Sequence, residues 1–324
     1  MAKEKFITEN LNNDGIDRRG FLKCMAWAGT GAYCVLRGGV LTSYALGDAA
    51  LRHGSLPRAT KGELAFVQIS DSHIGFNKPA NPDVVGTLRQ AIAKINSLPT
   101  PPAFILHTGD ITQLSKPDQF DAVAEILKDT RAERVFFVPG EHDVLDDDGA
   151  GYRERFAKGT MGDGWYSFDS AGAHFIGLVN VMNLKAGGLG NLGTDQLEWL
   201  QDDVKHLKSS TPIVVFAHIP LWSIYPDWGW GTSDAEQALS YLKRFGSVTV
   251  LNGHIHQTMK KVEGNITFHT AMSTAFPQAA PGVGAGPGPM KVDAGKLRSV
   301  LGITDVNFIR GRHTLGITDS TLES

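Results

Sequence analysis

The strongest constraint in this sequence is a series of apolar runs that each end in residues able to bind metal. Five such runs lie between residues 64 and 256, and stretches with helical apolar spacing separate them. This alternation predicts an α/β fold, in which the carboxyl ends of neighbouring strands meet at one edge of a sheet. The side chains expected to converge there are Asp71, His73, Asp110, Glu141, His142, His218, His254 and His256.

The first run, residues 64–70, leads directly into Asp71 and His73. Both side chains can project forward from the strand end. They combine a hard carboxylate oxygen with a borderline imidazole nitrogen, a mixture that suits divalent transition metals. A single Asp-x-His triplet occurs by chance in many chains. The repetition at five strand ends is therefore the observation that indicates a metal centre.

The rest of the chain has a clear pattern of secondary structure. Helices are predicted over residues 83–97, 117–128 and 233–245, and another begins at Thr194. A hairpin is predicted over residues 165–179, and short strands over 259–262 and 266–270. Residues 276–290 are rich in Pro, Gly and Ala and predict a long loop. The pentapeptide Leu-Gly-Ile-Thr-Asp, present at 301–305 and 315–319, favours a terminal pair of strands.

The N-terminal segment differs from everything that follows it. Arg18 and Arg19 precede Phe-Leu-Lys and a mildly apolar, Gly- and Ala-rich stretch, which resembles a twin-arginine export signal. Arg37 interrupts the run of about 20 apolar residues that a membrane span requires, so no stable span is expected. We expect a signal over residues 1–48, a linker over 49–62 and one domain over 63–324. A retained N-terminal anchor helix is the alternative reading.

Such a signal implies the twin-arginine export machinery as a partner and a periplasmic or otherwise exported bacterial protein. Both cysteines, Cys24 and Cys34, lie within the signal segment. The mature domain would then have no thiolate, so its metal ligands must be His, Asp and Glu. The net charge of −3 provides no basic surface for nucleic acid.

The order of the motifs, D-x-H, G-D, G-E-H-D, H and G-H-x-H, resembles the calcineurin-like metallophosphoesterases. This family includes purple acid phosphatases and cyclic nucleotide phosphodiesterases, and the resemblance extends from about Phe66 to Thr270. It implies two packed mixed β-sheets flanked by helices, in a four-layer sandwich. It also implies a hydrolase of small phosphate mono- or diesters with two divalent or mixed-valence transition metal ions, either Mn, Fe or Zn.

The resemblance assigns a role to each strand-terminal residue. His142 would contact the phosphoryl oxygens or donate a proton, with Asp143 orienting its ring. Seven residues would be metal ligands: Asp71, His73 and His256 on the first ion, Glu141, His218 and His254 on the second, and Asp110 on both.

Phosphate ester hydrolysis explains why such a set of ligands would be needed. The negative charge of the ester repels hydroxide. Two cations about 3.5–4 Å apart neutralise that charge, acidify a bridging water and align its attack. A bridging carboxylate offsets the repulsion between the two cations, and an imidazole can protonate the leaving group.

One ligand position departs from the family pattern, because Glu141 stands where an asparagine is usual. The carboxylate adds negative charge and lacks an amide donor, which leaves the metal preference and the affinity for phosphate open. A non-catalytic metal-binding protein that keeps the ligands is one alternative. An interaction module that uses residues 276–290 is another. His107, close to Asp110, is expected to be an outer partner of the site or a packed core residue.

Overall fold

The computed structural model describes residues 32–37, 40–45, 63–309 and 315–323. The chain divides into two units, residues 1–57 and 58–324. In the first unit, β1 (Ala32–Arg37) and β2 (Val40–Ala45) form an antiparallel pair. Arg18, Arg19 and residues 49–62 lie outside the described residues. Within the described ranges, no helix is both long and apolar enough to span a membrane.

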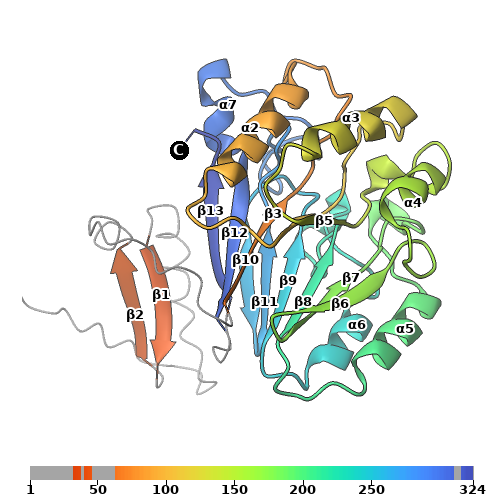
Figure 1. The fold of residues 1–324 in the computed structure, drawn as a ribbon, viewed down its shortest axis with the longest axis vertical. Coiled ribbons are helices and arrows are strands. Elements are labelled where there is room, and N and C mark those ends of the chain that lie inside the picture. The colour runs from red at the N-terminus through yellow and green to blue at the C-terminus, as the bar shows by residue number, and fades with distance from the viewer. Residues whose placement is uncertain (1–31, 38–39, 46–62, 310–314, 324) are drawn as a thin grey trace, which may run out of the picture. The chain divides into compact units, whose positions relative to one another are not determined.

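The second unit contains two mixed β-sheets (Figure 1). Its strands are β3 (Glu63–Ile69), β4 (Phe104–His107), β5 (Arg134–Phe137), β6 (Tyr166–Ser170), β7 (Ala173–Gly177), β8 (Ile213–Ala217), β9 (Val248–Asn252), β10 (Lys260–Glu263), β11 (Ile266–Thr270), β12 (Gly302–Ile309) and β13 (Gly316–Thr321). One sheet has the order β10-β11-β9-β8-β7-β6 and the other β13-β12-β3-β4-β5. The strands β3, β4 and β5 are parallel to one another, as are β7, β8, β9 and β11. The pairs β10-β11, β6-β7, β12-β13 and β12-β3 are antiparallel.

Helices cover the outer face of each sheet (Figure 1). The α-helices of this unit are α2 (Val84–Asn96), α3 (Pro117–Leu127), α4 (Ala150–Phe156), α5 (Thr194–Val204), α6 (Ala235–Leu242) and α7 (Leu297–Val300). The apolar faces of α2 and α3 share one core with β3 and β4, and those of α5 and α6 share another with β8 and β9. The predicted four-layer arrangement is therefore confirmed. The short helices α4 and α7 were not predicted.

A third core joins the two sheets. Phe66 on β3 stacks on Phe104 of β4 at 5.1 Å, and Phe175 on β7 contacts both rings edge-on. The next residues along these strands, Val67 and Ile105, face the helices instead. Because side chains alternate between the faces of a strand, strands buried on both faces read as continuous apolar runs. This double burial explains why the runs were recognisable in the sequence.

The terminal strands form the predicted pair and make a polar contact between the sheets. The carboxylate of Asp319 on β13 lies 3.0 Å from the His269 imidazole on β11 and 3.1 Å from the Lys260 ammonium. It also accepts a hydrogen bond of 2.8 Å from the Thr304 hydroxyl. Burial opposes ionisation, but the hydrogen bond and charge of His269 lower the pKa of Asp319 to about 2.

The free energy of unfolding of the Asp319→Asn variant is expected to be about 1–3 kcal/mol lower than that of the wild type at pH 7, because the amide pairs poorly with the buried donors around it. The folded-state pKa is depressed, so this stabilisation is present above about pH 4 and is lost as the pH falls toward 2. Urea unfolding at pH 7 and at stepwise lower pH measures the difference. Asp293, an exposed carboxylate, provides the control Asp293→Asn. An equal loss of unfolding free energy in both variants would contradict a stabilising role for the Asp319 contacts.

Candidate metal centre

The predicted ligands lie in loops at the carboxyl ends of five parallel strands. Asp71 and His73 follow β3, Asp110 follows β4, and Glu141 begins the short turn Glu141–Asp143 after β5. The remaining ligands follow β8 and β9, which belong to the other sheet. The apolar runs alone predicted that the ligands meet at the edge of a single sheet, which was wrong. The centre lies where the strand ends of two sheets come together, as the resemblance to a family with two packed sheets implied.

Five of the predicted ligands have an unusual backbone conformation. Left-handed φ angles occur at Asp71 (53°), His73 (42°), Asp110 (49°), His254 (70°) and His256 (54°). Non-glycine residues rarely adopt this region, at a cost of roughly 1–3 kcal/mol each, and such positions cluster at functional sites. The loops thus turn sharply where they present these side chains.

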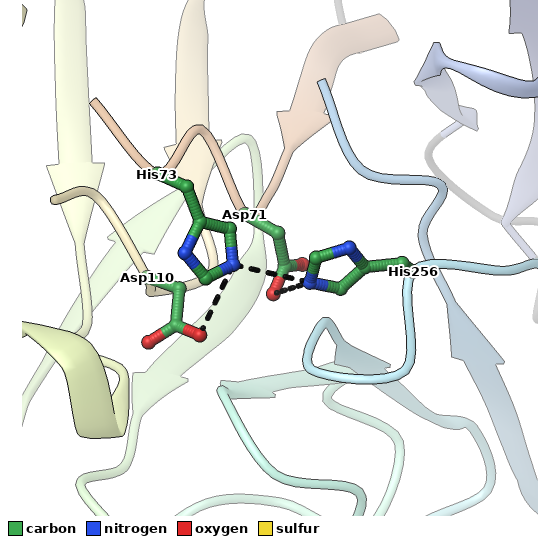
Figure 2. Close-up of side chains that lie close together, drawn as sticks. All are labelled: Asp71, His73, Asp110 and His256. Carbon is green, nitrogen blue, oxygen red and sulfur yellow. Dashed lines mark hydrogen bonds and ion pairs between the residues drawn. The ribbon is translucent and has the colours of Figure 1, made fainter. Parts of the chain in front are cut away.

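A first cluster consists of Asp71, His73, Asp110 and His256 (Figure 2). The His256 Nε2 atom lies 3.3 Å from Asp71 Oδ1 and 3.2 Å from His73 Nε2, which is itself 3.4 Å from Asp110 Oδ2. All four residues are buried. Ligand atoms held about 2.1 Å from one tetrahedral ion lie roughly 3–3.5 Å apart, so these separations fit a shared metal.

A second cluster consists of Glu141, His218 and His254. Each oxygen of Glu141 faces one imidazole: Oε2 lies 2.9 Å from His218 Nε2, and Oε1 lies 3.0 Å from His254 Nδ1. The two clusters meet at Asp110. Its Oδ2 atom is 3.4 Å from both His73 Nε2 and His218 Nε2. One carboxylate oxygen therefore contacts both groups.

The hydrogen bonds around the clusters engage the Nδ1 atoms of His218 and His256 and leave their Nε2 atoms free for metal. His218 Nδ1 donates to the Thr108 carbonyl at 2.7 Å, and His256 Nδ1 donates to the Phe276 carbonyl at 2.5 Å. In the neutral ring each Nε2 then carries the lone pair that a metal requires. Buried atoms without a hydrogen bond include His218 Nε2, Glu141 Oε2 and both nitrogens of His254. Such unsatisfied atoms fit a cation between them.

The charges within the centre favour ionised carboxylates but affect the rings differently. Burial lowers the pKa of His218, but Asp110 and Glu141 raise it well above its usual range, so this ring must lose a proton to bind metal. Burial would raise the pKa of Glu141, but the neighbouring His254 and His218 hold it well below its usual range. The pKa of Asp71 is likewise lowered despite burial, chiefly by His256. Burial lowers the pKa of His73 to about 3, so this ring is neutral. Ionised carboxylates and neutral imidazoles are the forms that bind metal.

His142 lies beside the ligands without belonging to either of the two clusters described above. Its backbone N–H donates to Asp110 Oδ1 at 2.9 Å, and its ring contacts the His73 ring edge-on. Its Nδ1 donates to the carbonyl of Gln113 at 2.8 Å. Burial lowers the pKa of His142, but Asp110 and Glu141 outweigh that effect and raise it.

Asp143 does not orient His142, contrary to the sequence-based expectation, because the ring is held by Gln113 instead. The Asp143 carboxylate accepts backbone N–H groups of Ile111, Thr112 and Gly140 at 2.8–3.0 Å. It therefore ties the loop after β4 to the loop after β5. Its contribution is to fix the positions of these two ligand-bearing loops.

Two outer partners complete the site. His107 Nε2 lies 2.9 Å from the hydroxyl of Ser72, the residue between the ligands Asp71 and His73 in the sequence. This contact matches the expected role of His107 as an outer partner of the site. The Phe276 ring packs 4.7 Å from the rings of both His73 and His256. Phe276 was missed because residues 276–290 carried no signal beyond that of a loop. Phe276 comes next to the ligands only when the chain folds.

Comparison with known proteins identifies the family. The model of the calcineurin-like phosphoesterases matches residues 64–258. The chain belongs to the calcineurin-like phosphoesterase family. Members of this family are metal-dependent phosphoric ester hydrolases, and this calcineurin-like phosphoesterase is an enzyme of that class.

Two relatives of this calcineurin-like phosphoesterase are named as enzymes. It is 25% identical over 221 residues to the serine/threonine-protein phosphatase CPPED1 of Danio rerio, covering 60% of this chain and 71% of that protein. It is 22% identical over 219 residues to a 3',5'-cyclic-nucleotide phosphodiesterase of Nostoc sp., covering 66% and 79%. The crystal structure of a dimetal phosphatase from Danio rerio shares the fold, with a TM-score of 0.57, 15% identity, and coverage of 80% and 96%.

Proposed function

We propose that this chain is an exported phosphoesterase that binds two metal ions and hydrolyses small phosphate mono- or diesters. The observation that carries the proposal is the contact of Asp110 Oδ2 with both His73 Nε2 and His218 Nε2 at 3.4 Å. A single oxygen between two clusters of ligands is the arrangement that a bridged pair of ions requires. Asp71, His73 and His256 would hold one ion, Glu141, His218 and His254 the other, and Asp110 both.

Two bound cations would neutralise the phosphate and acidify the attacking water. The protein residues supply the remaining steps. His142 is fixed by its backbone bond to Asp110 and by the bond from Nδ1 to Gln113. Nε2 is then the ring atom available to protonate the leaving oxygen. A protonated imidazole can supply that proton.

Two reasons favour a proposal that includes both phosphate monoesters and phosphate diesters as substrates. One relative is named as a protein phosphatase, which cleaves monoesters, and the other as a cyclic-nucleotide phosphodiesterase, which cleaves diesters. Both reactions use the same two-ion chemistry.

Removal and return of metal tests the proposal. The purified domain, stripped with a chelator, is expected to lose turnover of aryl phosphate mono- and diesters. Activity should return as about two equivalents of Mn, Fe or Zn bind, counted by elemental analysis. A protein that binds its metal fully but turns over neither ester class would refute the proposal and favour a non-catalytic metal-binding role.

Export through the twin-arginine route is proposed from the sequence alone, since the paired arginines lie outside the described residues. Lysine at both Arg18 and Arg19 should leave the folded protein in the cytoplasm, as judged by cell fractionation. Unchanged export of that variant would exclude the twin-arginine route.

A further inference from the structure

The centre brings three carboxylates together around the proposed pair of ions. Its seven ligands comprise four imidazoles and three carboxylates, those of Asp71, Asp110 and Glu141. Neutral imidazoles add no charge. Two divalent cations would carry four positive charges and the carboxylates three negative ones, which leaves a single positive charge before the attacking water loses its proton.

The three carboxylates differ in how they face the solvent. The side chain of Glu141 is 24% exposed, whereas those of Asp71 and Asp110 are 0% and 3% exposed. His254, which contacts Glu141, is 12% exposed. The second cluster is therefore the open side of the centre. A substrate that enters from solvent meets the charge of Glu141 before that of either aspartate.

Within the described residues, no lysine or arginine is an ion-pair partner of these carboxylates. Among the described residues, every ion pair of the three carboxylates is formed with a histidine. These histidines act as neutral ligands when metal is bound. Lysine or arginine residues, which commonly hold the second charge of a phosphate, form no ion pair with these carboxylates in the described part of the chain.

We propose that Glu141 makes this site select monoanionic phosphate diesters over dianionic phosphate monoesters. The proposal rests on the two-ion phosphoesterase function proposed above. A monoester carries nearly two negative charges at neutral pH and a diester carries one. Repulsion by a fixed charge is proportional to the charge of the substrate. Glu141 therefore penalises the monoester about twice as strongly as the diester.

Exchange of Glu141 for glutamine tests this selection, because the amide keeps the length of the side chain and removes its charge. Binding to the metal-loaded protein is measured by calorimetry at pH 8, with inorganic phosphate as the dianionic probe and dimethyl phosphate as the monoanionic one. In Glu141→Gln, phosphate is expected to bind about 10–100-fold more tightly relative to dimethyl phosphate. The ratio of kcat/KM for monoesters over diesters should rise in the same direction.

Glu141→Asp keeps the charge with one methylene fewer and serves as the matched control. It should retain the wild-type ratio of the two affinities. Metal content is measured for every variant at saturating metal. Equal shifts for both probes in Glu141→Gln, or loss of its second ion under these conditions, would overturn the proposal. If the wild type instead turned over neither ester, the proposed function would fail while the binding titrations still reported on Glu141.

Discussion

Replacement of Asp110 by asparagine is expected to prevent the binding of two ions and to reduce ester hydrolysis at least about a thousandfold. Asp110 Oδ2 lies 3.4 Å from a ring nitrogen of each cluster. Two cations a few ångströms apart repel strongly unless an anion lies between them. The neutral amide removes that anion, so the second ion should be lost. Elemental analysis of the purified variant and its kcat for an aryl phosphate measure the two effects.

The fold of this variant should survive. Asp110 Oδ1 accepts the His142 backbone N–H at 2.9 Å, and an amide oxygen can accept the same bond. Asp129, an exposed carboxylate paired with Arg89, provides the control Asp129→Asn. That control should keep both ions and full activity. An Asp110→Asn protein that still binds two ions and keeps more than a tenth of the activity would refute the bridging role.

The glycines of the ligand motifs have a steric explanation. A Cβ atom on Gly253 would lie 2.0 Å from Ser70 Oγ, and one on Gly140 would lie 2.1 Å from Asp110 Oδ1. Gly109 has a φ of 94°. These positions therefore need glycine because the loops approach one another closely around the ligands. In the pairs G-D, G-E and G-H, the glycine allows the close approach of the loops and the second residue is the proposed metal ligand.

The sequence predicted the strands well because most of them are buried on both faces. Phe66 faces the other sheet and Val67 the helices, so the run is apolar apart from the buried Gln68. The assignment of strands to two sheets could not be read in this way. His218 and His254 follow apolar runs like those before Asp71 and Asp110, yet they come from the six-stranded sheet. Strand order depends on contacts between distant segments, which local periodicity does not record.

The outer partners of the site were harder to predict than the ligands. Asp143 lies next to His142 in sequence, and the family resemblance implied that it orients the His142 ring. In the fold its carboxylate binds backbone N–H groups after β4, and the carbonyl of Gln113 holds the ring. Phe276 acts through a backbone carbonyl and through ring packing. Any residue type supplies a carbonyl, so no sequence pattern marks such a role.

Replacement of His142 by asparagine is expected to lower kcat about 100- to 10,000-fold while both ions remain bound. The bond to Asp110 comes from the backbone N–H of His142 and is not removed by the substitution. Loss of metal by this variant would contradict a role limited to the substrate. The two roles proposed for the ring, proton donation and contact with phosphoryl oxygens, predict different dependence on the leaving group.

A proton donor matters most when the leaving oxygen is basic. The loss in His142→Asn should therefore be large for alkyl phosphates and small for p-nitrophenyl phosphate, whose leaving group departs without protonation. A contact with the phosphoryl oxygens would reduce both rates equally, because those oxygens are the same in the two substrates. Comparison of kcat for the two esters, in the wild type and the variant at pH 7, separates these cases. Equal losses would assign His142 to phosphate binding, and the proton for the leaving group would then have to come from another group near the centre.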